Sequence, residues 1–205
     1  MRNYYLVIVI PTFFFLTGSR DLSGQSWVFI KEKEGIKLYT RNEANNSVKS
    51  FKGEVCLNAQ METLFSLITN VKNFDSWDDD IREIKVLLYE KDKLIQYYLI
   101  YDVSWPITDR DLVVESLIMI DPVTGTRSVE ARSLLNVIPE RPDLIRIKKY
   151  WQKWTLVPME NGLVQVILEG SVDPGGSVPA WLSNMVITDT PLKVIRSVKT
   201  YSGAK

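Results

Sequence analysis

The sequence contains no histidine and only one cysteine among its 205 residues. Without histidine, serine-histidine triads and cysteine-histidine pairs are excluded, and the side chain that most often acts as a general base near neutral pH is missing. Structural zinc sites are built mainly from cysteine and histidine, so a lone Cys56 does not form one. No intramolecular disulfide can form. The neighbours Val55 and Leu57 predict that Cys56 is a small core residue of a strand.

The chain also lacks an excess of charge of either sign. Lys and Arg together number 25, as do Asp and Glu, so the formal net charge at pH 7 is zero. Binding to a nucleic acid backbone needs a basic patch or stripe, and none stands out, so no nucleic acid partner is expected. With 45% hydrophobic and 24% charged residues, a chain of this length is expected to form one globular domain around a single core.

Motifs for phosphate and metal binding are missing as well. Gly175 and Gly176 are not followed by the lysine of a P-loop. Acidic residues gather around Trp77, and carboxylates can bind Ca²⁺ or Mg²⁺. These acids are Asp75, Asp78, Asp79 and Asp80. Their spacing fits no EF-hand loop, so the cluster is interpreted as a solvated connection between a helix and a strand. We expect no metal, no other cofactor and no catalytic constellation.

The first 25 residues differ from the rest of the chain. Arg2 is followed by the apolar run Leu6 to Leu16 and then by the small and polar stretch Gly18 to Ser26, an order typical of a secretory signal peptide. The run is shorter than the roughly 20 apolar residues of a membrane span. We predict a cleaved signal peptide over 1–25 and a mature domain over 26–205, with an uncleaved anchor or a buried strand as alternatives. Export without disulfides favours a bacterial periplasm or envelope.

Most of the remaining chain alternates strand-forming segments with turns. Val, Ile, Leu and aromatic residues dominate seven segments, as is typical of strands. The segments are 48–57, 84–89, 94–103, 111–120, 127–135, 144–157 and 163–172. Turn sequences at 90–93, 121–125 and 160–162 suit hairpins. Consecutive hairpins predict one antiparallel, meandering sheet.

Two segments have helical spacing instead. Asn58 is a candidate N-cap for the first helix, whose apolar residues recur every three or four positions. They are Met61, Leu64, Phe65, Ile68 and Val71. The second helix is expected over 179–201, with Ser177 as its cap and a kink near its middle at Pro191. Its apolar stripe, expected to face the sheet, contains Trp181, Met185, Leu192 and Ile195. The predicted fold is α+β, with the element order β-α-β(n)-α.

One charged residue interrupts a segment that otherwise has the pattern of a buried strand. If residues 110–120 form a strand with period two, Arg110 shares the more apolar face with Leu112 and Val114. An unpaired buried charge is costly, so Arg110 needs a carboxylate, water or a polar ligand group beside it.

Two acids in neighbouring strands are candidate partners for this arginine. Asp102, in the preceding strand, is the first candidate and Glu130 is the second. The period of their strands does not decide which face of the sheet either acid occupies. The alternative is a surface ion pair between Arg110 and Asp109 or Asp111 at the start of the strand.

Two segments resemble the START family, the lipid-transfer domains related to the steroidogenic acute regulatory protein. They are WPITDRDLVV and DPGGSVPAWLSNM, about 60 residues apart as in the family. The matching residues are Trp105, Pro106, Arg110, Asp111 and Val113 in the first, and Asp173, Pro174, Gly176, Pro179, Trp181 and Leu182 in the second. After Arg110 and Asp111 this chain has Leu112, where the family more often has an aromatic residue. This difference is expected to change the shape of the pocket.

The resemblance implies a helix-grip fold, in which a curved antiparallel sheet wraps around a long kinked C-terminal helix, as in START and Bet v 1-like proteins. A cavity closed by this helix would hold a lipid or sterol-like hydrophobic ligand. The loop over 136–143 is expected beside the helix. Arg110 would be the polar anchor inside the cavity. The implied ligand-binding residues are Arg110, Asp102, Tyr98, Trp105, Leu112, Val114, Trp181, Met185, Leu192 and Ile195. A monomer that contacts membranes transiently and catalyses no reaction is expected.

Two other functions remain open. Related helix-grip proteins include polyketide cyclases and aromatases, whose pockets orient a flexible substrate for proton transfer. The candidate groups for such an enzyme are Arg110, Asp102, Tyr98 and Tyr101. A module that binds a protein partner would instead need a large exposed apolar patch.

Overall fold

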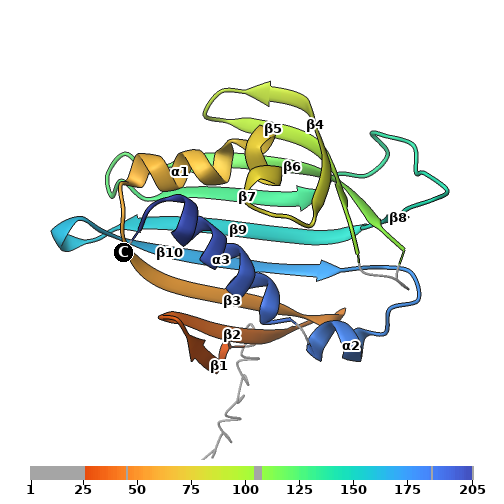
Figure 1. Ribbon diagram of the computed structural model, residues 1–205, viewed down its shortest axis with the longest axis horizontal. Helices are drawn as coiled ribbons and strands as arrows, with labels where there is room; N and C mark the ends of the chain where they lie inside the picture. The colour runs from red at the N-terminus through yellow and green to blue at the C-terminus, as the bar shows by residue number, and fades with distance from the viewer. Residues whose placement is uncertain (1–25, 45, 104–107, 186, 205) are drawn as a thin grey trace, which may run out of the picture.

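The computed structural model describes residues 26–44, 46–103, 108–185 and 187–204. Over these residues the chain forms a curved sheet with helices on one face (Figure 1). The predicted signal peptide over 1–25 and Trp105 lie outside the described residues. None of the described helices is both long and apolar enough to cross a membrane.

The described residues form a ten-stranded sheet. Its strands are β1 (Val28–Lys33), β2 (Ile36–Glu43), β3 (Asn46–Asn58), β4 (Ile81–Glu90), β5 (Leu94–Tyr101), β6 (Arg110–Ile120), β7 (Arg127–Ser133), β8 (Ile145–Arg146), β9 (Lys149–Pro158) and β10 (Leu163–Asp173). The order is β1-β2-β3-β10-β9-β7-β6-β5-β4, with antiparallel neighbours, and the short β8 pairs in parallel with β6. The predicted antiparallel sheet is confirmed, although the segment over 144–157 divides into β8 and β9.

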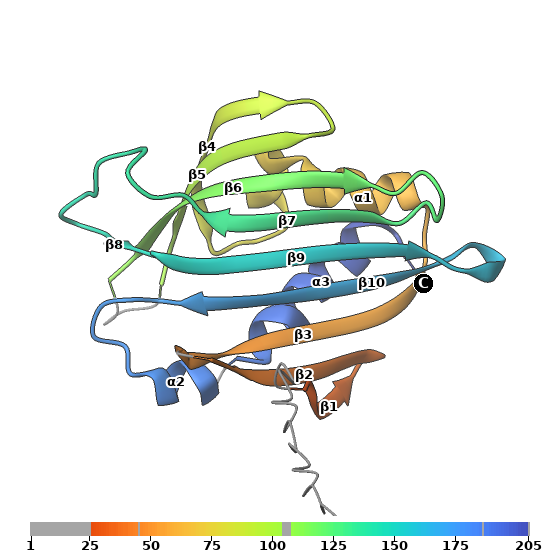
Figure 2. The same ribbon diagram turned by 180° about the vertical axis from the view of Figure 1, so that it is seen from behind.

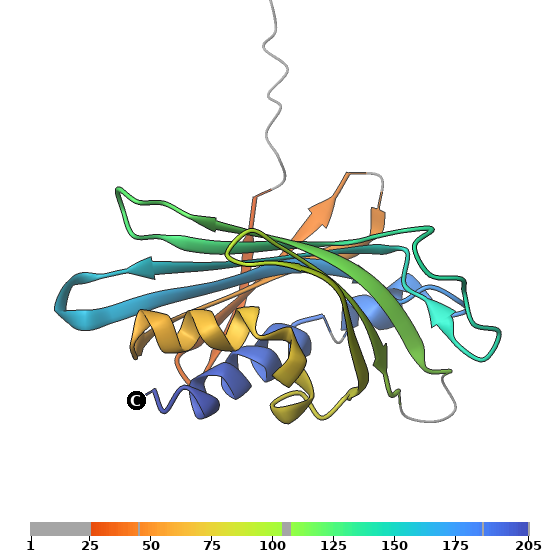
Figure 3. The same cartoon turned by 90° about the horizontal axis from the view of Figure 1, so that it is seen from above.

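The helical elements are α1 (Met61–Thr69), the 3-10 helices η1 (Val71–Ser76) and η2 (Glu160–Gly162), α2 (Ala180–Met185) and α3 (Asp189–Tyr201). The helices α1 and α3 lie side by side on the concave face of the sheet (Figures 1 and 3). The view from behind shows the opposite, convex face without helices over its centre (Figure 2). This arrangement is the predicted helix-grip fold.

The main core fills the space between the concave face and these two helices. The apolar stripe of α1 is buried through Leu64, Phe65 and Ile68, and that of α3 through Leu192, Ile195 and Val198. Alternate residues of the strands meet them from the sheet, as the period of two requires. Cys56 alternates with buried residues of β3 and is exposed, so its predicted place in the core is wrong.

The C-terminal helix is divided rather than kinked at Pro191. The first piece ends at Met185 and the second begins at Asp189. Pro191 is the third residue of α3, where the backbone N–H has no partner within the helix, so proline costs little there. The division changes the phase of the apolar stripe, and Trp181 and Met185 are 64% and 66% exposed. Their predicted contact with the sheet is therefore wrong.

A polar side chain fixes α2 against the sheet. Asn184 accepts a hydrogen bond from the backbone N–H of Lys49 at 2.9 Å and donates one to the backbone carbonyl of Ser47 at 2.9 Å. The side-chain amide thus pairs with β3 as a neighbouring strand would. This contact holds α2 at the beginning of β3, beside the start of α3.

A second, smaller core lies on the convex face. Tyr98, Ile100, Val113 and Leu144 are buried there, and Leu134 and Ile138 pack against them. The segment over 136–143 therefore covers the convex side and not the C-terminal helix, which corrects its expected location. Both faces of β5 and β6 are consequently buried at this end of the sheet.

Candidate functional site

A cavity of about 400 Å³ lies between the concave face of the sheet and the divided C-terminal helix. Its apolar walls include Val48, Phe51, Leu112, Ile147, Val172, Val178, Leu182, Ile187 and Val194, and its polar lining includes Arg110, Tyr101, Tyr150, Gln152, Ser183, Lys193, Asp78 and Asp80. A deeper cavity of about 60 Å³ shares Tyr101, Tyr150, Gln152, Val194 and Asp78 with it. The two spaces therefore adjoin and run toward the core.

Arg110 is the first residue of β6 and is only 4% exposed. Its Nε donates a hydrogen bond to the carbonyl of Pro174 at 3.3 Å, and its Nη1 donates to the carbonyl of Thr108. Burial lowers the pKa of the Arg110 guanidinium, and the nearby charge of Asp109 opposes the change. No carboxylate among the described residues lies within ion-pair distance of the guanidinium. A buried cation without such a partner favours a polar ligand group beside it.

The two carboxylates predicted to pair with Arg110 are engaged elsewhere. Asp102 lies 2.8 Å from Arg82, and Glu130 lies 2.7 Å from Lys153. Both predicted pairings are wrong. Even Asp109, the neighbour of Arg110 in the chain, binds Arg82 at 2.7 Å.

Asp111, the other charged residue of the motif, points to the convex face. It forms a bidentate ion pair with Arg146, with both oxygen-to-nitrogen distances at 2.8 Å, and accepts a hydrogen bond from Tyr98 at 3.1 Å. The hydrogen bonds to Asp111 outweigh burial and raise the pKa of Arg146. Arg146 also donates to the carbonyl of Ile138 at 3.1 Å. The pair therefore connects β6 and β8 to the segment over 136–143.

Tyrosines supply further polar groups on the concave side. Tyr101 is the direct neighbour of Arg110 across the β5–β6 ladder. Burial raises the pKa of Tyr101 and of Tyr150 above the ordinary value. Burial likewise raises the pKa of Tyr97 to about 12, against a hydrogen bond with Ser116. These phenols therefore stay neutral and offer hydroxyl groups rather than charges.

Two buried polar atoms around the cavities have no hydrogen-bond partner among the described residues. They are Nε1 of Trp77, beside the smaller cavity, and Oγ of Ser183, beside the larger one. Buried polar groups in native proteins are almost always paired, with protein, water or ligand. Both atoms lie at cavity walls, where water or the polar atoms of a ligand can pair with them.

Lys193 of α3 forms ion pairs across the side of the cavity. It donates hydrogen bonds to Asp78 at 2.9 Å and to Asp80 at 2.5 Å. Although burial opposes the charged form, these hydrogen bonds raise the pKa of Lys193. The acidic cluster after the first helix, interpreted above as a solvated connection, thus holds α3 against the segment before β4.

We expect the variant Lys193→Met to loosen α3. The lysine side chain is 41% exposed, so each ion pair contributes at most about 1 kcal/mol and the protection of α3 amides from hydrogen exchange falls by about two- to tenfold. Because the pKa of Lys193 is raised above its usual 10.5, titration of the lysine leaves the contribution intact below pH 10.5 and removes it as pH rises through the raised pKa. The variant Lys199→Met is the control. Equal protection in all three proteins would contradict the prediction.

The predicted ligand-binding residues fall into several groups. Arg110 and Leu112 line the cavity. Val114, Leu192 and Ile195 are buried in the main core. The residues away from the cavity are Tyr98 on the convex face and the exposed Asp102, Trp181 and Met185. The sequence reasoning missed Tyr150, Gln152, Ser183 and Lys193, whose strand or helix period gave no sign that a cavity interrupts the core.

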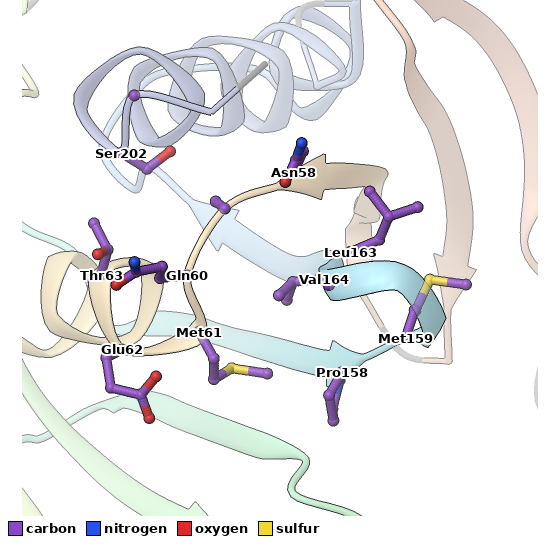
Figure 4. Close-up of a pocket in the computed structure, with 13 residues that line it drawn as sticks. Asn58, Gln60, Met61, Glu62, Thr63, Pro158, Met159, Leu163, Val164 and Ser202 are labelled. Carbon is purple, nitrogen blue, oxygen red and sulfur yellow. The ribbon is translucent and has the colours of Figure 1, made fainter.

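A second hollow lies at the other end of the sheet, where the C-terminal residues approach the start of α1 and the β9–β10 turn (Figure 4). Its volume is about 720 Å³, but most of its lining residues are exposed. Asn58, Gln60 and Ser202 give it a polar rim (Figure 4). Apolar side chains such as Met61 and Met159 also line it, but it is open to solvent, whereas small-molecule sites are mostly enclosed and apolar. The cavity beside Arg110 is therefore the stronger candidate.

Comparisons with known proteins identify the family of this chain. The model of the START domain matches residues 18–202. An uncharacterized protein of Pseudomonas aeruginosa is 28% identical over 200 residues, covering 98% of each chain. The phosphatidylcholine transfer protein of Bos taurus is 24% identical over 172 residues, which cover 80% of this chain and 78% of that protein.

Solved structures agree with the fold. The STAR-related lipid transfer protein from Xanthomonas axonopodis, a fragment spanning 25–204, superposes with a TM-score of 0.79 and 28% identity, covering 86% of this chain and 98% of that one. Human STARD10 has the same fold, with a TM-score of 0.77 at 16% identity, over 86% of this chain and 72% of that one. The chain belongs to the START domain family.

Proposed function

We propose that the protein binds a lipid or another hydrophobic small molecule in the cavity beside Arg110 and transfers it. The observation that carries the proposal is the apolar cavity of about 400 Å³ with a buried arginine at its wall. Binding sites for small molecules combine such apolar walls with few polar groups that orient the ligand. Membership of the START family and the lipid transfer proteins among its relatives support the same function.

The proposed route of entry passes the divided C-terminal helix. Leu182 and Ser183 of α2 and Val194 of α3 form one wall of the cavity, so a displacement of these helices would open it. Short helices held mainly by side-chain contacts open more easily than the sheet unfolds. Transient contact with a membrane would allow a ligand to pass directly between the bilayer and the cavity.

The proposal includes export from the cytoplasm of a bacterium. Its support is the sequence alone: the charged start, the apolar run and the polar stretch within residues 1–25. Expression of the full chain in a bacterial host, followed by mass measurement of the protein recovered from the periplasm, tests this part. A mass equal to that of the full chain would contradict cleavage.

The enzyme alternative receives less support from the geometry. Of its four candidate groups, Arg110 and Tyr101 line the cavity, whereas Asp102 is exposed and Tyr98 lies in the convex core. General acid–base catalysis needs groups within hydrogen-bond reach of one substrate. Binding without chemistry is therefore the function that we propose.

The cavity-filling variant Val172→Trp tests the proposed site. Val172 lines the cavity, so an indole at this position is expected to occupy the ligand space and reduce the amount of co-purifying lipid at least about tenfold. Native mass spectrometry followed by organic extraction measures the bound lipid. The matched control is Val123→Trp, because Val123 is 90% exposed in the β6–β7 turn. Equal lipid in both folded variants would contradict the proposed site.

A further inference from the structure

The size of the cavity limits the ligand that it can hold. A methylene group occupies nearly the volume of a water molecule in the liquid, about 30 Å³. The 400 Å³ between the lining residues therefore has room for roughly a dozen such groups. The adjoining 60 Å³ adds about two more. A glycerophospholipid with two long chains and a head group needs several times this space. A single hydrocarbon chain fits it.

The charges around the cavity limit the head group. Lys193 pairs with both Asp78 and Asp80, so this cation is already neutralised and the three side chains together carry one negative charge. Arg110 is the other cation of the described lining, and it is hydrogen-bonded only to carbonyl groups of described residues. Two of the five guanidinium donors are used in these bonds. The remaining donors suit an anionic oxygen, which forms shorter and stronger hydrogen bonds with arginine than a neutral acceptor does.

The rest of the polar lining adds no further positive charge for a large head group. Tyr101 and Tyr150 remain neutral because burial raises the pKa of each phenol. Gln152 and Ser183 contribute an amide and a hydroxyl. Arg110 is thus the cation of the described lining that no carboxylate neutralises, and it matches a small head group that carries a single negative charge.

We infer that the ligand is an amphiphile with one hydrocarbon chain of about fourteen carbons and a carboxylate that Arg110 binds, as in a medium- or long-chain fatty acid. The inference rests on the function proposed above and narrows it to one chemical class. The chain would run from Arg110 along the apolar walls toward the smaller cavity, past Tyr101 and Val194, which line both spaces.

A chain-length series tests the size argument. The purified protein, freed of bound lipid, is titrated with octanoate, decanoate, dodecanoate, tetradecanoate, hexadecanoate and octadecanoate by native mass spectrometry. Each methylene that enters the cavity is expected to raise the affinity by up to about fourfold, until the chain reaches about fourteen carbons and the gain stops. A gain that continues undiminished to octadecanoate would contradict the volume limit.

A comparison of acid with alcohol tests the role of Arg110. Tetradecanoate is expected to bind the wild type about 10- to 100-fold more tightly than tetradecanol, because only the acid forms charge-assisted hydrogen bonds. This preference is expected to disappear in Arg110→Gln and to persist in part in Arg110→Lys. The control Arg141→Gln removes an exposed arginine on the convex side and should leave the preference intact.

Other outcomes separate this inference from the proposed function. In one outcome, the wild type binds one molecule of phosphatidylcholine and no tetradecanoate, and Val172→Trp does not bind phosphatidylcholine. This outcome would overturn the inference and leave the proposed lipid binding in place. Equal binding of tetradecanoate and tetradecanol by the wild type would overturn the role of Arg110. Failure to bind any of these probes would overturn both proposals.

Discussion

Replacing Asp111 by alanine is expected to lower the free energy of unfolding by about 3–5 kcal/mol. Asp111 and Arg146 have side chains only 1% and 3% exposed, and the change leaves the buried guanidinium without a counter-charge. The hydroxyl of Tyr98 also loses its acceptor. Equilibrium unfolding in urea measures the effect.

A double variant separates the charge from the packing at this position. Replacing both partners, in Asp111→Leu with Arg146→Met, removes the buried charges together, so most of the lost stability should return. Asp143→Ala is the control, because its ion pair with Arg141 lies on the same face and is exposed, and its loss should cost less than about 1 kcal/mol. If Asp111→Ala costs no more than this control, the pair is not a principal contact of the fold.

Replacing Gly53 by alanine is expected to push α3 away from the sheet. A Cβ at this position would lie 2.6 Å from Cδ1 of Ile195 and 3.1 Å from Cβ of Pro191. Such overpacking costs about 1–3 kcal/mol. Because α3 also walls the cavity, the release rate of bound lipid is expected to rise as stability falls. Stopped-flow transfer of lipid to acceptor vesicles and thermal unfolding measure the two effects.

A compensating change shows whether this clash is the cause. Ile195→Val removes the Cδ1 atom and alone costs about 0.5–1.5 kcal/mol. Combined with Gly53→Ala, it should cost less than the sum of the two single changes, since the worst contact is gone. Strictly additive losses would mean that Gly53→Ala acts elsewhere, for example on the backbone of β3.

The strands and their order in the chain could be predicted because alternation and turn chemistry act locally. The hairpin before β10 is an example: Asn161 and Gly162 have φ angles of 62° and 75°, which the predicted Asn-Gly turn needs. The strands β1 and β2 are absent from the segments that the pattern predicts. All six residues of β1 are exposed, so this strand carries no buried face and no period of two.

The site was only partly predictable, for a reason visible in β5. Tyr98 and Ile100 face the convex core, whereas Tyr97, Leu99 and Tyr101 face the concave side. Both sets are apolar or aromatic because the segment over 136–143 covers the convex face. Alternation therefore does not reveal which tyrosine reaches the cavity. The sequence predicts Tyr98 as a ligand-binding residue and names Tyr101 only for the enzyme alternative.

Local sequence patterns also do not determine two other features of the site, the division of the C-terminal helix and the hydrogen-bond partners of Arg110. Trp181 and Leu182 are neighbours in sequence, and a division of the helix after Met185 decides which of them meets the cavity. The buried face of Arg110 was predicted correctly from the period of β6. Its partners were not, because they are backbone carbonyls, which no side-chain pattern encodes.

The helix α3 connects two distant edges of an open sheet. Lys193 binds the segment that precedes the edge strand β4, whereas Arg196 binds Glu34 at the turn between β1 and β2, with two hydrogen bonds of 2.8 Å. These ion pairs therefore connect both edges of the sheet to one helix. A ligand that displaces α3 would also relax the spacing between the two edges, so a pair of spectroscopic labels on β1 and β4 should report loading and unloading from outside the cavity.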